Sequence, residues 1–99
     1  MDIQQSTLVF KISEHNSISD LNITSKIKHF IADLRGANKE TTERVRNKFI
    51  TFDNSISEKN GSFVIVCEFS FDDSLKIVPT LQEAYDYIEM EEIERQLKL

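Results

Sequence analysis

The sequence has little of several residue types that mark particular classes of protein. Its 99 residues include one cysteine, one proline, two glycines and no tryptophan. A single cysteine cannot form an internal disulfide, which excludes a disulfide-stabilised secreted domain. Two glycines do not make a glycine-rich phosphate loop. Long apolar runs and the features of a secretion signal are also missing. We therefore expect a cytoplasmic protein without membrane association.

Basic charge is scarce as well. Twelve lysines and arginines stand against 17 acidic residues, which gives a net charge of -5. Nucleic acids and anionic membranes are bound through clustered basic surface, so neither is an expected partner. Hydrophobic residues make up 39% and charged residues 29%, an ordinary globular composition. The length suits one domain with one core, and we assign residues 1–99 to it.

Apolar runs predict three strands. In the segment 7–12, Leu8, Phe10 and Ile12 share one face, and Thr7 and Lys11 lie on the other face with Val9. The continuous run of residues 63–67 is rich in β-branched types, as is typical of a central strand covered on both faces. Residues 75–78 form a short strand that Pro79 ends. The polar residues 14–20 between these strands predict a loop.

Helical spacing predicts two helices and leaves one segment open. Apolar residues share one face of a helix over about residues 40–57, which ends near the Asn60-Gly61 pair. Thr80 and Glu83 form a capping box, after which a helix runs to near the C-terminus. In the segment 23–34 the apolar residues recur at helical spacing, whereas residues 30–34 equally fit a short strand.

Residues 78–85 (VPTLQEAY) are similar to the last strand and helix of STAS domains, the fold of anti-sigma-factor antagonists. Residues 30–34 (FIADL) resemble the central strand of that family, and residues 60–66 resemble its glycine-initiated next strand. Residues 88–97 resemble the end of small STAS-like proteins of Bacteroidetes, some of which carry the label ribonuclease Z. The resemblance implies an α/β fold with a single mixed sheet and helices packed against it, and it favours a strand at residues 30–34.

The sequence also departs from the STAS pattern. Family members carry a phosphoacceptor serine among small residues at the start of the second helix, whereas this chain has Thr41-Thr42-Glu43-Arg44. Thr42, with Thr41 beside it, is the candidate phosphoacceptor, although a threonine there is more simply a helix N-cap. Residues 68–74 are too few for a crossover helix, which leaves an extended link or an antiparallel hairpin. The resemblance implies a shortened regulatory, protein-binding module.

No residue pattern indicates catalysis or a metal. His15 and His29 lack cysteine or carboxylate partners at ligand spacing, so we expect surface histidines without a cofactor. Two histidines do not build the dinuclear site of a metallo-β-lactamase-type ribonuclease, and that activity is not expected. Cys67 lies in an apolar run with no base nearby in the sequence, which does not suit a nucleophile. A small-ligand, nucleotide-like sensor is the alternative function.

The C-terminal helix carries two apolar stripes. The first includes Leu81 and Ile88, and charged residues at the following positions predict that packing ends near Ile88. The second stripe, Met90, Ile93 and Leu97, is the candidate docking surface for a protein partner or a second copy, so we expect a monomer or weak homodimer. Folding back on the sheet or fraying is the alternative. Residues 89–99 are treated as a helical extension whose glutamates are expected to form a solvated face.

Overall fold

The structure, a computed structural model, describes residues 6–11 and 27–97. The elements in these ranges are β1 (Thr7–Lys11), β2 (His29–Asp33), α1 (Lys39–Glu58), β3 (Ser62–Val66), β4 (Ile77–Val78) and α2 (Leu81–Leu97). The loop predicted at residues 14–20, including His15, lies outside the described residues. The first predicted strand and both predicted helices are confirmed within one or two residues where the structure describes them.

The strands form one parallel sheet in the order β1-β2-β3-β4. The expectation of a mixed sheet is therefore wrong for the described strands. β2 confirms the strand interpretation of residues 30–34 up to Asp33, and it pairs with a neighbour on each side. Every residue of β2 and β3 is buried, as expected for central strands covered on both faces.

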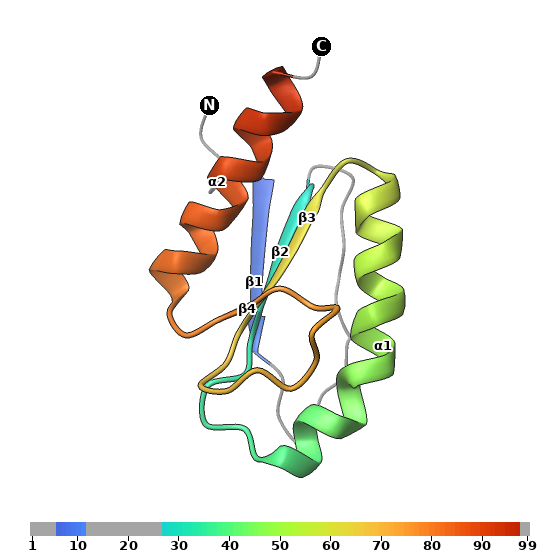
Figure 1. Cartoon of the computed structure of the whole chain (residues 1–99), viewed down its shortest axis with the longest axis vertical. Coiled ribbons are helices and arrows are strands. Elements are labelled where there is room, and N and C mark those ends of the chain that lie inside the picture. Colours follow the sequence, from blue (N-terminus) through green and yellow to red (C-terminus); the bar gives the residue numbers. More distant parts are fainter. Residues whose placement is uncertain (1–5, 12–26, 98–99) are drawn as a thin grey trace.

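Alternation along β2 and β3 divides the core into two layers, because successive side chains of a strand point to opposite faces. Phe30 and Phe63 are partners in register and pack on the α1 side, whereas Ile31 and Val64 pack on the α2 side. The two helices accordingly cover opposite faces of the sheet (Figure 1). The ring of Phe49 on α1 meets Phe63 edge-on, with 5.3 Å between centroids, which suits an aromatic pair.

α1 begins one residue after its cap, Asn38. The Oδ1 atom of Asn38 accepts a hydrogen bond from the backbone N–H of Thr41 at 2.8 Å. An asparagine at this position satisfies a backbone donor that has no partner within the helix. The expectation that a threonine caps this helix is wrong, because Thr41 and Thr42 lie inside its first turn. After α1 the chain turns through Asn60, whose φ is 62°, into Gly61, which confirms the predicted end.

The connection between β3 and β4, residues 67–76, contains no helix. The rings of Phe69 and Phe71 lie 6.3 Å apart and pack against the α1 side of the core, where Leu75 is buried. Apolar side chains of the link thus occupy space that a crossover helix usually covers. The extended link is confirmed, and the antiparallel hairpin is wrong because β4 pairs parallel to β3. β4 itself is shorter than the predicted segment 75–78.

α2 is one continuous helix that crosses the sheet face and continues beyond its edge (Figure 1). The Oγ1 atom of Thr80 accepts a hydrogen bond from the N–H of Glu83 at 3.1 Å, which confirms the threonine half of the capping box. Ala84 and Ile88 are fully buried against β2 and β3. The next position on that side is Glu92, which is also buried, so the prediction that packing ends near Ile88 is wrong.

Candidate functional site

A charged cluster fastens the C-terminal half of α2 to the start of β2. Its centre is Glu92, whose side chain is only 8% exposed. The Oε1 atom of Glu92 accepts a hydrogen bond from Lys28 Nζ at 3.0 Å, and Oε2 accepts one from Arg95 Nη1 at 3.2 Å. A carboxylate this deeply buried is stable only with such partners, because an unpaired buried charge is costly.

His29 contributes a buried, neutral ring to this cluster. It is 1% exposed, so the expectation of a surface histidine is wrong for this residue. Its Nδ1 atom accepts a hydrogen bond from the backbone N–H of Ser62 at 3.1 Å. An accepting nitrogen carries no proton, which places the ring proton on Nε2. Nε2 lies 3.1 Å from Glu92 Oε2, but without the alignment of a hydrogen bond.

Arg95 extends the cluster to the turn before β3. Its Nη2 atom donates to the carbonyl oxygen of Gly61 at 2.7 Å and to Ser62 Oγ at 2.8 Å. Arg95 also forms an ion pair with Glu91, with Nη2 3.9 Å from Oε1. A side chain at Gly61 would collide with the backbone oxygen of Lys28, so this turn packs directly against the start of β2. The cluster therefore joins α2 to the starts of β2 and β3, at the amino-terminal end of the two central strands.

The charges in the cluster follow from its geometry. Burial acts to raise the pKa of Glu92, but the combined effect of Lys28, His29 and Arg95 is larger and holds this pKa below its ordinary value. Burial lowers the pKa of His29, and the opposing attraction of Glu92 is weaker. At neutral pH the cluster therefore holds one carboxylate between two cations, with a neutral histidine. Its polar atoms contact each other, and we interpret it as a structural anchor.

The opposite side of the same helical turns carries the second apolar stripe. Met90 is 62% exposed, Ile93 50% and Leu97 80%. These side chains do not fold back on the sheet, because the anchor residues Glu92 and Arg95 occupy the side of α2 that faces it. We call Met90, Ile93 and Leu97 the apolar strip. The structure thus brings together all three residues of the predicted docking surface.

The candidate phosphoacceptors are enclosed at the start of α1. Thr42 is 1% exposed, and its hydroxyl donates a hydrogen bond to the carbonyl oxygen of Lys39 at 2.8 Å. Thr41 is 6% exposed and lies beside a polar pocket of about 310 Å³ that Asn38, Glu40 and Arg44 also line. A kinase would reach the Thr42 hydroxyl only after the first turn of α1 opened. Phosphorylation of these residues stays a prediction.

Asp33, at the carboxyl end of β2, has its carboxylate fully engaged. Arg35 donates to it from Nε at 3.0 Å, from Nη2 at 2.8 Å and from its backbone N–H at 3.0 Å. These hydrogen bonds hold the pKa of Asp33 below its ordinary value, against the opposing effect of burial. The arrangement closes the turn after β2, and it leaves little of this carboxylate for a ligand.

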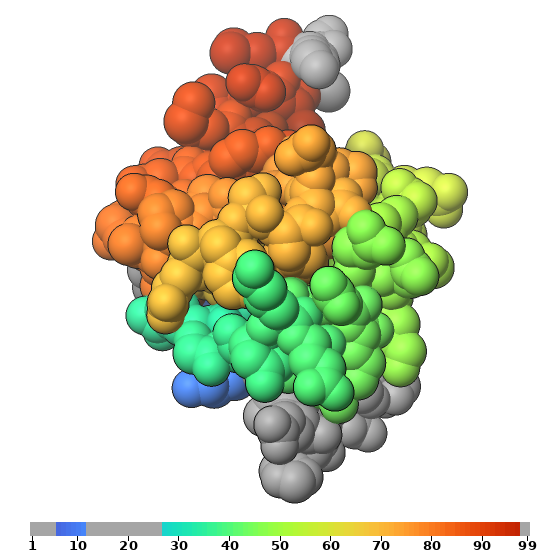
Figure 2. All heavy atoms as spheres, turned by 60° about the horizontal axis from the view of Figure 1, so that its bottom comes forward, coloured from blue at the N-terminus to red at the C-terminus, as the bar shows by residue number. Residues whose placement is uncertain are grey.

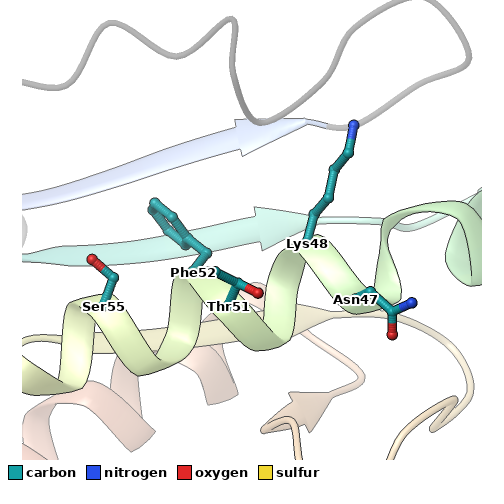
Figure 3. Close-up of a pocket in the computed structure, with 5 residues that line it drawn as sticks. All are labelled: Asn47, Lys48, Thr51, Phe52 and Ser55. Carbon is teal, nitrogen blue, oxygen red and sulfur yellow. The ribbon is translucent and has the colours of Figure 1, made fainter.

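A larger pocket, of about 520 Å³, lies along the flank of α1 (Figure 3). The described residues that line it, Asn47, Lys48, Thr51, Phe52 and Ser55, all come from this one helix. Phe52 is the one aromatic residue among these five, and its ring makes edge-on contacts with Phe30 and Phe63 in the core. The described residues therefore bring no convergent set of polar groups to this pocket, unlike a typical small-molecule site.

Within residues 6–11 and 27–97, no group of three or more His, Cys, Asp and Glu side chains is arranged to hold a metal ion. None of the helices described is both long enough and apolar enough to cross a membrane.

Comparison with known proteins gives no relative: no family model, curated protein or solved structure matches the chain. The function is therefore inferred from the residues of this chain alone. Sequence reasoning missed the anchor, yet one signal for it was present. Glu92 lies four residues after Ile88 on the buried stripe of α2, where a carboxylate needs a cation, and Arg95 is one turn away.

Proposed function

We propose that the chain is a non-enzymatic protein-binding and regulatory module of STAS-like type, and that the apolar strip on α2 is its docking surface. The observation that carries this proposal is the exposure of Met90, Ile93 and Leu97 at i, i+3 and i+7 on an anchored helix. Single exposed apolar residues are ordinary. Three along one helical face are the pattern of anchors in helix-in-groove recognition.

The anchor supports a docking role because it makes the strip rigid. The last turns of a terminal helix fray easily unless they are tied down. Here Glu92 and Arg95 tie these turns to β2 and β3, so the strip is presented without a further ordering cost on binding. The same contacts support a non-enzymatic role, because His29 and Glu92, the groups suited to acid–base chemistry, are buried in the anchor. Buried, unpaired Cys67 suits a reducing, cytoplasmic location.

Replacement of both Ile93 and Leu97 by serine tests the proposal. Because these side chains are exposed, the double variant should unfold within about 0.5 kcal/mol of the wild-type chain in urea. Capture of the partner from the native host, or self-association, should be lost. Asn47→Ser with Thr51→Ser, at exposed positions four residues apart on α1, is the matched control and should keep every interaction. A folded Ile93/Leu97 variant that keeps every interaction would contradict the proposal, as would a stability loss of several kcal/mol, which indicates a core role.

A small-ligand sensor is the second candidate function, and the polar pocket beside the start of α1 is the feature that favours it. Backbone N–H groups at a helix start attract anions. The Glu40 carboxylate that lines this pocket opposes a phosphate. A reproducible thermal stabilisation by one nucleotide, and not by others, would favour the sensor over the docking module.

A further inference from the structure

The charged residues around the apolar strip point to the chemistry of its partner. We infer that the strip docks a basic amphipathic helix of another protein. This inference rests on the proposed function and adds to it the sign of the partner's charge and its secondary structure.

The exposed face of α2 carries acidic residues and no described basic one. Glu89 lies one turn before Ile93, and Glu94 lies one turn after Met90, so a carboxylate borders the strip on each side. Glu83 and Asp86 are exposed on the preceding turns of the same helix. None of these four carboxylates forms an ion pair with a residue in the described ranges.

The cations near α2 are used on its other side. Arg95 is the only basic residue within α2, and its guanidinium donates to Gly61 and Ser62. Lys28 pairs with Glu92 at 3.0 Å, and the Lys76 ammonium lies 3.6 Å from Glu91. Charge is therefore separated across the helix. The described cations lie between α2 and the sheet, and the carboxylates without a described ion-pair partner lie around the strip on the other side.

The dimensions of the strip suit a helix. Met90 and Leu97 are separated by seven residues, or about 10 Å along the axis at ~1.5 Å per residue. A partner helix with apolar residues at i, i+3 or i+4, and i+7 presents anchors over the same length. The C-terminal end of α2 projects beyond the other described elements in the ribbon and space-filling views, and the anchor contacts only its sheet-facing side (Figure 1, Figure 2).

The same charges disfavour other occupants. A second copy of this chain would place its own Glu89 and Glu94 against these carboxylates, and like charges across an interface are costly. Nucleic acids and anionic membranes carry the wrong sign of charge. A helix with lysines or arginines beside an apolar stripe complements both the apolar side chains and the carboxylates of this face.

Three matched helical peptides provide the probe. They share leucines at i, i+3, i+4 and i+7 and differ only in flanking residues, which are lysine, glutamine or glutamate. In titrations followed by amide NMR shifts, the lysine peptide should perturb Met90, Ile93 and Leu97. Because four carboxylates that form no ion pair with a described residue each contribute a small ion-pair increment, it should bind about tenfold more tightly than the glutamine peptide. This preference should weaken as salt rises.

Charge reversal gives the control. Glu89→Lys with Glu94→Lys should remove the preference for the lysine peptide, whereas Glu40→Lys with Glu43→Lys on α1 makes the same charge change elsewhere and should keep it. The inference is overturned if the glutamine or glutamate peptide binds as tightly as the lysine peptide or more tightly. It is also overturned if no peptide binds to the strip, or if the chain self-associates through the strip. None of these results decides whether the strip is a docking surface, because the Ile93 and Leu97 double variant tests that proposal separately. A failure of this inference can therefore be told apart from a failure of the proposed function.

Discussion

Replacement of Glu92 by alanine should destabilise the protein by about 2–4 kcal/mol. Glu92 accepts hydrogen bonds from two cationic groups, Lys28 and Arg95, and such bonds contribute about 1.5–3 kcal/mol each. The expected loss is smaller than their sum, because the Lys28 side chain is 41% exposed and regains water when its partner is removed. Arg95 also keeps its hydrogen bonds to the turn before β3.

Urea denaturation, followed by circular dichroism, measures this loss. Glu92→Gln keeps the size of the side chain without its charge and should fall between the wild type and Glu92→Ala. Glu89→Ala, an exposed glutamate of the same helix, is the control and should change the free energy of unfolding by less than about 0.5 kcal/mol. If Glu92→Ala is as stable as Glu89→Ala, the reasoning that α2 is anchored by a buried carboxylate is wrong.

Two further predictions concern the same edge of the sheet. Because burial lowers the pKa of His29 in the folded chain, the unfolded chain binds this proton first, and stability should fall as the pH drops below about 6.5. The lowered pKa of Glu92 has the same sign and adds a second loss at lower pH, below about 4.5. His29→Asn keeps an acceptor for the Ser62 N–H but has no ring to protonate. Its urea midpoints at about pH 7.5 and pH 5.5 should therefore lack the loss of stability that His29 causes. If the variant loses as much stability as the wild type, His29 is not the source of this loss. Gly61→Ala should prevent normal folding, because its Cβ meets the Lys28 backbone and comes within 2.8 Å of Ile56 Cγ2. Gly36→Ala, with φ at +82° and open space around it, should cost only about 1–2 kcal/mol, and equal losses at both glycines would refute the steric argument.

The local patterns of the sequence predicted most of the elements, because these patterns depend on near neighbours along the chain. The apolar run at residues 63–67, the helical face of α1 and the Thr80 cap all appear where expected. Residues 30–34 remained open from periodicity alone, since a buried strand and a helical segment share the same apolar content. The sheet settles this segment, because β2 is bonded to a strand on each side.

The direction of the last strand and the anchor were not predictable in the same way. The short link left an extended connection and an antiparallel hairpin open. Phe69 and Phe71 pack against the core, Leu75 is buried in it, and the chain returns to start a strand parallel to β3. The anchor joins Lys28 to Glu92, which are 64 residues apart in the sequence. No local rule connects them. The apolar strip, in contrast, was found from helical spacing, because a set of residues on one helix depends on that helix alone.

Site-specific photo-crosslinking in the native host shows whether α2 binds a protein through the apolar strip. A photoreactive phenylalanine analogue at position 93, on the apolar strip, should form a specific protein adduct. The same analogue at Lys48, on the exposed flank of α1 (Figure 3), should not form that adduct. An adduct that appears at position 93 and disappears when Leu97 is replaced by serine is the result that docking on α2 predicts. No adduct at position 93, or the same adduct at both positions, would contradict it.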